Sequence, residues 1–161
     1  RSPSRGLGDV YKRQELSYGM HILIRTELEI ELIEGNLKAK DLPFEWNKKY
    51  KKLLGIEPCS DAEGCLQDVH WSEGAFGYFP SYLIGHLISA QLTSQLEKDI
   101  GLIDQFIEKN DYQTIINWLK KNVHCHGRSL NAMELVKKVS GNELSSDFFL
   151  DYLKQKIDEL N

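Results

Sequence analysis

Residues 15–35 read ELSYGMHILIRTELEIELIEG and carry a helical repeat of apolar side chains. The apolar positions recur at intervals of three and four residues, and no proline interrupts them, so they fall on one face of a helix. Gly35 and Asn36 follow, and both residue types readily adopt the left-handed conformation that ends helices. The stretch therefore predicts a long, largely buried helix. Its apolar residues are Leu16, Met20, Ile24, Leu28 and Leu32, with Ile22, Ile30 and Ile33 widening the stripe.

Capping residues and glycines predict further helices after residue 36. Asp41 precedes a helix whose first turn holds Pro43, where a missing N–H costs nothing, and Gly55 ends it. Asn131 and Glu134 have the spacing of a capping box. No strand pair and no internal repeat is visible, so the predicted fold class is all-α. The remaining predicted helices span residues 80–98, 100–110, 112–126, 131–141 and 147–160.

The composition is that of one ordinary globular domain. The 161 residues are 41% hydrophobic and 27% charged, which suffices for a real core. A formal charge of −4 argues against nucleic acid or an anionic membrane surface as a partner. No apolar run reaches the roughly 20 residues that span a bilayer, and no signal peptide is visible, so we expect a cytoplasmic protein. Three cysteines without C-x-x-C spacing argue against a disulfide framework.

The first 14 residues, RSPSRGLGDVYKRQ, differ in character from the rest of the chain. They are basic and turn-rich, whereas the residues after them are acidic and helical. The string resembles a translated adapter or assembly scar, and such segments do not belong in fold reasoning. We therefore expect a non-native tail over residues 1–14 and the domain proper over residues 15–161. The alternative is a genuine, disordered N-terminal tail.

Residues 56–78 break all periodicity and form a long predicted loop, which in a compact domain is usually functional. Polar and aromatic groups on a loop backed by a helix suit a binding cleft. Tyr78 and Tyr82 lie four apart at the helix entry, and with His70 they form a set of donors for a developing oxyanion. The alternative is that the aromatic residues only pin the loop to the core. The candidate residues are Gln67, Asp68, His70, Trp71, Tyr78 and Tyr82.

Residues 64–71, GCLQDVHW, match the G-x-x-Q-D-x-H-W signature of the carboxypeptidase Taq family. The run from Ser72 to Tyr82 resembles that family's continuation, S-x-G-x-x-G-Y-F-P-[ST]-Y. So many fixed positions of mixed chemistry make a specific signal. The resemblance extends over most of residues 15–161, and the other matching segments are ELSYGMHILIRTELE (15–29), DLPFEWN (41–47), VHCHGR (123–128) and FFLDYLKQKI (148–157).

Membership of this family implies an activity for a larger parent protein. Family members are large, mostly helical and usually dimeric peptidases that release C-terminal residues from peptides with Zn²⁺ or sometimes Co²⁺. The ion is held by H-E-x-x-H and a downstream Glu, and the motif's own Glu serves as the general base. The resemblance therefore implies that this chain is the C-terminal helical portion of a zinc carboxypeptidase, with peptide substrates and a homodimeric parent.

The sequence contains no H-E-x-x-H, so no residue is assigned as a zinc ligand. We expect the motif to lie upstream of Glu15 in the parent, and we expect this fragment alone to be inactive and to hold no metal. The resemblance implies that His70 and Tyr82, with Tyr78 as a second candidate, are the catalytic donors. Its implied substrate-binding residues are Arg25, Gln67, Asp68 and Trp71.

Several roles stay open at this point. Gln67 and Asp68 are better suited to orienting His70 than to reacting. Arg25 either binds a substrate carboxylate or pairs with a neighbouring Glu on its helix. His124 and His126 are more suited to capping than to metal binding, and His21 and His86 to satisfied core positions. The alternative function is a non-catalytic helical module that binds a peptide or partner helix. An endopeptidase or dipeptidase of related helical architecture is a third reading.

Overall fold

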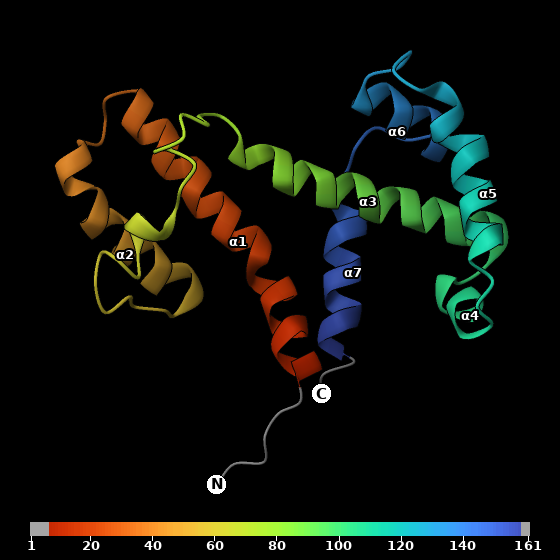
Figure 1. The fold of residues 1–161 in the computed structure, drawn as a ribbon, viewed down its shortest axis with the longest axis horizontal. Helices are drawn as coiled ribbons and strands as arrows, with labels where there is room; N and C mark the ends of the chain where they lie inside the picture. Colours follow the sequence, from red (N-terminus) through yellow and green to blue (C-terminus); the bar gives the residue numbers. More distant parts are fainter. Residues whose placement is uncertain (1–6, 159–161) are drawn as a thin grey trace, which may run out of the picture. The chain divides into compact units, whose positions relative to one another are not determined.

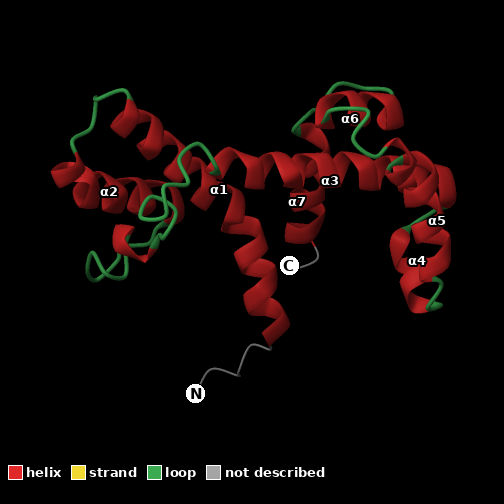
Figure 2. Ribbon diagram, turned by 45° about the horizontal axis from the view of Figure 1, so that its top comes forward, coloured by secondary structure: helices red, strands yellow, loops and turns green. Residues whose placement is uncertain are grey.

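A computed structural model describes the backbone of residues 7–158 and the side chains of residues 15–158. Every regular element in this range is a helix, which confirms the all-α prediction (Figure 2). The chain divides into two compact units, Arg1–Ile84 and Gly85–Asn161, and the division falls within helix α3 (Phe79–Ile100). The residues predicted above to be catalytic or substrate-binding all belong to the first unit.

The first unit is built on helices α1 (Leu7–Ile33) and α2 (Leu42–Leu54), which pack side by side (Figure 1). A 3₁₀ turn, η1 (Ala39–Asp41), precedes α2, and a second, η2 (Cys65–Gln67), lies in the loop before α3. The buried core joins α1 and α2 to this loop. Its buried residues are Ile24, Leu28, Leu37, Trp46, Tyr50 and Cys65.

Helix α1 differs from its prediction at its start. It begins at Leu7, not near Glu15, because residues 7–14 contain no proline and the helical backbone hydrogen bonding continues through them. Residues 1–6 of the predicted tail lie outside the described residues. The non-native origin of residues 1–14 stays a prediction. On the helix itself Ile24 and Leu28 are buried, whereas Ile30 and Ile33 are exposed, so the buried stripe is narrower than predicted.

Helix α2 begins and ends where the sequence predicts. Asp41 is the N-cap residue, although its side chain makes no capping hydrogen bond, and Pro43 lies in the first turn. Gly55 adopts the left-handed conformation with φ of 68° and donates its N–H to the carbonyl of Lys51. A side chain at Gly55 would be strained in this conformation, which explains why glycine ends the helix.

The second unit contains the rest of α3, then α4 (Ile103–Glu108), α5 (Tyr112–Asn122), α6 (Ala132–Ser140) and α7 (Asp147–Asp158). The capping box of α6 is confirmed: Asn131 Oδ1 accepts from the N–H of Glu134 at 3.0 Å, and Glu134 Oε2 accepts from the N–H of Asn131 at 2.8 Å. The predicted helix over residues 112–126 stops at Asn122, where the side chain turns back onto the carbonyl of Trp118. A 3₁₀ turn, η3 (His124–His126), follows.

Gln91 is the buried centre of the second unit, with no exposed surface. Its Nε2 donates to Ser140 Oγ at 2.9 Å and to the carbonyl of Glu143 at 3.0 Å. Its Oε1 accepts from the N–H of Ser145 at 3.0 Å. One side chain of α3 thereby fixes the connection between α6 and α7.

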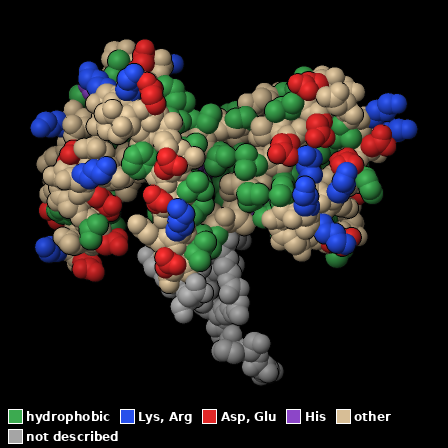
Figure 3. Space-filling model, turned by 180° about the vertical axis from the view of Figure 1, so that it is seen from behind, with side chains coloured by type: hydrophobic (Ala, Val, Ile, Leu, Met, Phe, Trp, Pro, Cys, Tyr) green, Lys and Arg blue, Asp and Glu red, His purple; other side chains and the backbone are tan. Residues whose placement is uncertain are grey.

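Other surface features bear on the predictions. His86 is exposed on α3, with its ring 5.8 Å from that of Phe149, so the prediction that it occupies the core is wrong. Lys and Arg side chains are interspersed with Asp and Glu on the face shown in Figure 3. None of the helices in the described part of the chain combines the length and apolarity required to cross a bilayer.

Candidate active site: a hydrogen-bond chain from Arg25 to Tyr82

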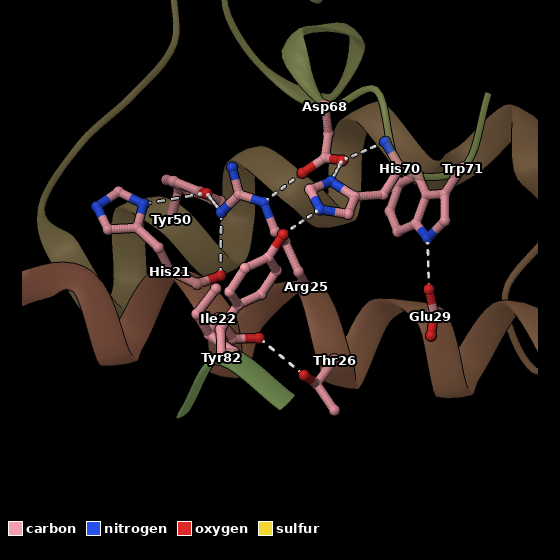
Figure 4. Close-up of polar contacts among 10 residues, drawn as sticks. All are labelled: His21, Ile22, Arg25, Thr26, Glu29, Tyr50, Asp68, His70, Trp71 and Tyr82. Atoms are coloured by element: carbon pink, nitrogen blue, oxygen red, sulfur yellow. Dashed lines mark hydrogen bonds and ion pairs between the residues drawn. The ribbon is translucent and has the colours of Figure 1, made fainter. Parts of the chain in front are cut away.

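Asp68 is the centre of the site, and 4% of its side chain is exposed. Its Oδ2 accepts from Arg25 Nε at 2.6 Å, and its Oδ1 accepts from the backbone N–H of His70 at 2.9 Å (Figure 4). The same Oδ1 lies 2.7 Å from His70 Nδ1. Because a carboxylate only accepts, we assign the ring proton to Nδ1. Asp68 thus orients His70, as the sequence predicts.

The chain of hydrogen bonds continues from His70 to Tyr82, at the start of α3. Its Nε2 lies 3.1 Å from the hydroxyl oxygen of Tyr82. With Nδ1 protonated, Nε2 of the neutral ring is an acceptor, so the hydroxyl of Tyr82 donates to it. This chain of hydrogen bonds runs from helix α1 through the loop to α3. It ends on a hydroxyl whose hydrogen can rotate toward another acceptor.

Burial and hydrogen bonding act in opposite directions on Asp68. Burial, the largest contribution, raises the pKa of its carboxyl group, because a charge loses solvation in the interior. Hydrogen bonds from Arg25 and His70, together with the charge of Arg25, outweigh this effect. The net result is a pKa below the ordinary value of 3.8, so Asp68 stays ionised and keeps its pairing with Arg25.

Arg25 is held in place by α1 and α2. Its Nη1 donates to the hydroxyl of Tyr50 at 2.5 Å and to the carbonyl of His21 at 3.0 Å. Its guanidinium carbon lies 4.9 Å from the centroid of the Trp46 ring, a cation–π distance. The guanidinium is therefore fixed by contacts on more than one side before any ligand arrives.

The predicted alternative, an ion pair between Arg25 and a neighbouring Glu on its helix, is wrong. The glutamates of that part of α1 have other partners: Glu27 and Glu31 pair with Lys49, at 2.7 and 3.3 Å. Arg25 pairs with Asp68 instead, 43 residues away.

His21 is half-buried and satisfied, as predicted, with Nδ1 3.2 Å from the hydroxyl of Tyr50. Burial lowers the pKa of His21 below its ordinary 6.5, and the nearby charge of Arg25 lowers it further. Burial raises the pKa of Tyr50, although the charge of Arg25 opposes this. Both groups are therefore neutral at pH 7, which leaves Arg25 as the cation of this corner.

Glu29 anchors the other end of the loop. Its side chain is buried, with its Oε2 accepting from Trp71 Nε1 at 2.8 Å and its Oε1 from the N–H of Gly77 at 2.5 Å. The ring of Trp71 packs edge-on against those of Trp46 and Phe79. Trp71 thus pins the loop to the core, as one alternative expected, and its predicted role in substrate binding stays a prediction.

The structure brings His70, Tyr78 and Tyr82 together, as the sequence predicts. With its Nδ1 proton directed at Asp68, however, the neutral ring of His70 accepts at Nε2 and does not act as the predicted donor. The rings of Tyr78 and Tyr82 meet edge-on at 5.1 Å, and the ring of Tyr78 stacks on His70 at 6.1 Å. Tyr78 is 51% exposed, so about half of the residue is accessible to a ligand. Gln67 is exposed and makes no side-chain hydrogen bond to another described residue, so of the two residues predicted to orient His70 only Asp68 contacts it.

A pocket of about 550 Å³ lies beside Arg25. It is separate from the His70–Tyr82 pair, since neither residue lines it. Gln67 faces it together with residues of α1, α2 and the loop. The lining residues are His21, Arg25, Trp46, Tyr50, Ile56, Glu57, Pro58, Glu63, Gly64 and Gln67.

The described residues do not fit a metal site. Within residues 15–158, no group of three or more His, Cys, Asp or Glu side chains is placed to hold an ion. His124 and His126 lie in η3, whose N-cap residue is Val123, and their predicted capping role stays a prediction. No chemical step of this chain's residues is therefore assigned to a bound metal.

Tyr50, Glu29 and His21 contribute to the site without having been predicted to do so. The partners of their side chains lie between 25 and 48 residues away in sequence, so no local pattern reveals these contacts. The one usable signal was Glu29, a charged residue one position after Leu28 in the buried stripe of α1.

Residues 12–157 match the family model described as carboxypeptidase Taq (M32) metallopeptidase. The chain belongs to this family. Among curated M32 relatives, it is 42% identical over 146 residues to carboxypeptidase 1 of Bacillus subtilis (strain 168), with 91% of this chain and 29% of the relative covered. It is 40% identical over 141 residues to thermostable carboxypeptidase 1 of Pyrococcus furiosus, covering 88% and 28%.

Solved structures of M32 enzymes have the same fold over the shared region. An M32 carboxypeptidase from Deinococcus radiodurans R1 superposes with a TM-score of 0.84 at 36% identity, covering 89% of this chain and 29% of the other. Metallocarboxypeptidase 1 of Trypanosoma cruzi gives 0.82 at 39% identity, covering 86% and 29%. The chain thus spans less than a third of the length of these relatives, which supports an M32 fragment.

Proposed function

We propose that this chain forms the substrate-binding wall of a zinc-dependent carboxypeptidase that releases C-terminal residues from peptides. Support comes from the carboxypeptidase names of the relatives and from the family match over residues 12–157. In this proposal the zinc ligands come from outside this sequence, which has no H-E-x-x-H, and cobalt is the alternative ion. A homodimeric parent in the cytoplasm completes the proposal.

The observation that carries the proposal is the fixed pair of His70 Nε2 and Tyr82 hydroxyl at 3.1 Å. When a peptide carbonyl approaches, the hydroxyl of Tyr82 rotates from His70 toward the carbonyl oxygen. The contact strengthens as that oxygen gains negative charge, and one such donor contributes about 3 to 4 kcal/mol to transition-state stabilisation. Asp68, which pairs with Arg25, holds the imidazole of His70 in place, so these side chains need to move little when the substrate binds.

Tyr78 has a second place in this arrangement. Its hydroxyl lies on the same ring cluster as Tyr82, and it is the second candidate donor to the substrate backbone. Trp71 and Gln67 lie in the loop, and we assign them contacts to the peptide rather than to the scissile carbonyl. None of these roles requires a metal held by this chain.

A chimera tests the proposal. Residues 15–157 replace the matched segment of Bacillus subtilis carboxypeptidase 1, to which the chain is 42% identical. We expect the chimera to release C-terminal amino acids from peptides in a metal-dependent manner, and the 161-residue chain alone to release none. A folded, metal-loaded chimera without activity would contradict the proposal.

A variant of the chimera tests the residue roles. His70→Ala should lower kcat about 100-fold or more, because it removes the acceptor that positions Tyr82, while the metal content stays the same. His126→Ala, in a turn of the other unit, is the matched control and should leave kcat unchanged. Parallel loss of metal and activity in His70→Ala would show that His70 supports the metal site instead.

A further inference from the structure

The pocket beside Arg25 has a ligand chemistry of its own. Its volume, about 550 Å³, lies within the range of small-molecule sites. Helices α1 and α2 form one part of it, and the loop around residues 56–67 forms the other. Its lining includes one permanent cation, two carboxylates and three apolar side chains, so it offers each kind of contact that a small charged ligand needs.

Arg25 supplies the positive end. Its Nε and Nη1 donate to Asp68, Tyr50 and the carbonyl of His21. Its Nη2 carries two further N–H groups, and no acceptor for them is found among the described residues. The side chain is 20% exposed and lines the pocket. A guanidinium with unused donors on a pocket wall favours a carboxylate ligand.

Glu63 supplies the negative end. Of the two carboxylates that line the pocket, Glu57 already pairs with Lys51 at 2.8 Å. The carboxylate of Glu63 makes no ion pair within the described residues. It lies on an exposed part of the loop. The pocket thus offers an acceptor for a cation in addition to the donors of Arg25.

Apolar side chains line the same pocket as the two charged groups. Trp46, Ile56 and Pro58 line the same pocket, and the Trp46 ring is held by stacking on Tyr50 at 4.8 Å. An aliphatic side chain that packs against such a wall is removed from water, which favours binding. A ligand that matches all three features carries a carboxylate, an ammonium group and an apolar side chain.

We propose that this pocket binds a small zwitterion, either a free amino acid or a dipeptide with apolar side chains. The carboxylate pairs with Arg25, the ammonium group with Glu63, and the side chain lies against Trp46. This assignment goes beyond the peptidase function, since it uses a pocket that neither His70 nor Tyr82 lines. It requires only residues of the first unit, so it can be tested independently of catalysis.

Ligand titrations on the 161-residue chain test the proposal. L-leucine and L-leucyl-L-leucine represent the two sources, and calorimetry shows which one binds more tightly. L-leucinamide lacks the carboxylate and 4-methylpentanoate lacks the ammonium group. Each should bind about tenfold or more weakly than leucine, because a charge-assisted contact is lost. Equal affinity for leucine and either analogue, or no saturable binding of leucine and the dipeptide, would overturn the proposal.

Variants locate the binding. Glu63→Gln should abolish the preference for leucine over 4-methylpentanoate, and Glu73→Gln, exposed on the same loop but outside the pocket, should preserve it. Arg25→Gln should abolish the preference for leucine over leucinamide. If the chain alone does not fold, the same titrations are carried out on the metal-free chimeric carboxypeptidase, so that the dipeptide is not hydrolysed during the measurement. Unchanged preferences in Glu63→Gln would contradict the assignment even if the chimera is an active peptidase.

Discussion

Asp68 in the first unit and Gln91 in the second each join distant segments of the chain, but through chemically different partners. Each is a buried polar side chain that joins segments more than 40 residues apart. The partners of Gln91 are backbone groups and the hydroxyl of Ser140, and all of them are neutral. The partners of Asp68 include a guanidinium and an imidazole, and the chain that it starts ends on the hydroxyl of Tyr82.

The different partners of Gln91 and Asp68 distinguish a purely structural cluster from one that can bind a ligand. A neutral amide saturated by backbone groups has no capacity left for a ligand, so Gln91 only fixes a connection. The Asp68 cluster retains unused capacity at both ends, namely the Nη2 donors of Arg25 and the rotatable hydroxyl of Tyr82. Charged, partly exposed clusters of this kind are typical of sites that act on a ligand.

Asp68→Asn should have the largest effect on stability. The substitution leaves the charge of Arg25 without its partner in a largely buried site, and we expect a loss of about 3 kcal/mol in the free energy of unfolding. Urea denaturation of the chain measures it. Asp61→Asn, exposed on the same loop, should change stability little. A similar small effect for both would mean that the Arg25 pair is not formed.

Gln91→Met should follow, with a loss of about 2 kcal/mol, because the N–H of Ser145 and the carbonyl of Glu143 lose their partner. Methionine keeps the length of the side chain, so packing changes little. Gln95→Met, one turn along α3, is the control, since its hydrogen bond to Asp99 is exposed. Equal losses from the two variants would contradict the proposed clamp.

Glu29→Gln should cost about 1 kcal/mol, since one of the two N–H groups that Glu29 accepts from would face an amide N–H instead. The loop over residues 56–78 should also become more sensitive to limited proteolysis. Glu31→Gln loses only a half-exposed ion pair with Lys49 and should retain the loop's resistance. Undiminished resistance in Glu29→Gln would exclude Glu29 as the anchor.

The smallest expected effect concerns pH. The pKa of His21 is lowered in the folded chain, so below its ordinary value of 6.5 the unfolded state binds more protons than the folded state. Stability is therefore complete above pH 6.5 and falls as the pH drops through that value. His21→Gln should remove this part of the decline. Urea midpoints at pH 7.5 and 5.5 measure it, and an unchanged decline would contradict the burial of His21.

Local patterns predicted much of the fold. Asn131 with Glu134, Pro43 in a first turn and Gly55 at a helix end each depend on neighbours within a few residues, and the structure confirms all three. Prediction failed where the outcome depends on distant contacts. The exposure of His86 is an example, since which face of a helix is covered depends on elements far away in sequence. The start of α1 was missed for another reason, because residues 7–14 were set aside for their resemblance to an assembly scar.

The site was predictable in part for the same reason. His70, Tyr78 and Tyr82 lie within 13 consecutive residues, so a loop followed by a helix brings them together. The pairing of Arg25 with Asp68 spans 43 residues, and composition gives no hint of it. Nor does it reveal Tyr50, which meets Arg25 only because α1 and α2 pack against each other.

The most direct test of the central claim is the effect of Tyr82→Phe on the chimeric carboxypeptidase. The substitution removes only the hydroxyl at the end of the Asp68–His70–Tyr82 chain. We predict that kcat falls about 100-fold, while KM and metal content change little, because the hydroxyl acts mainly on the transition state. Tyr112→Phe, an exposed tyrosine of the other unit, should leave kcat unchanged. An unchanged kcat in Tyr82→Phe would contradict the account.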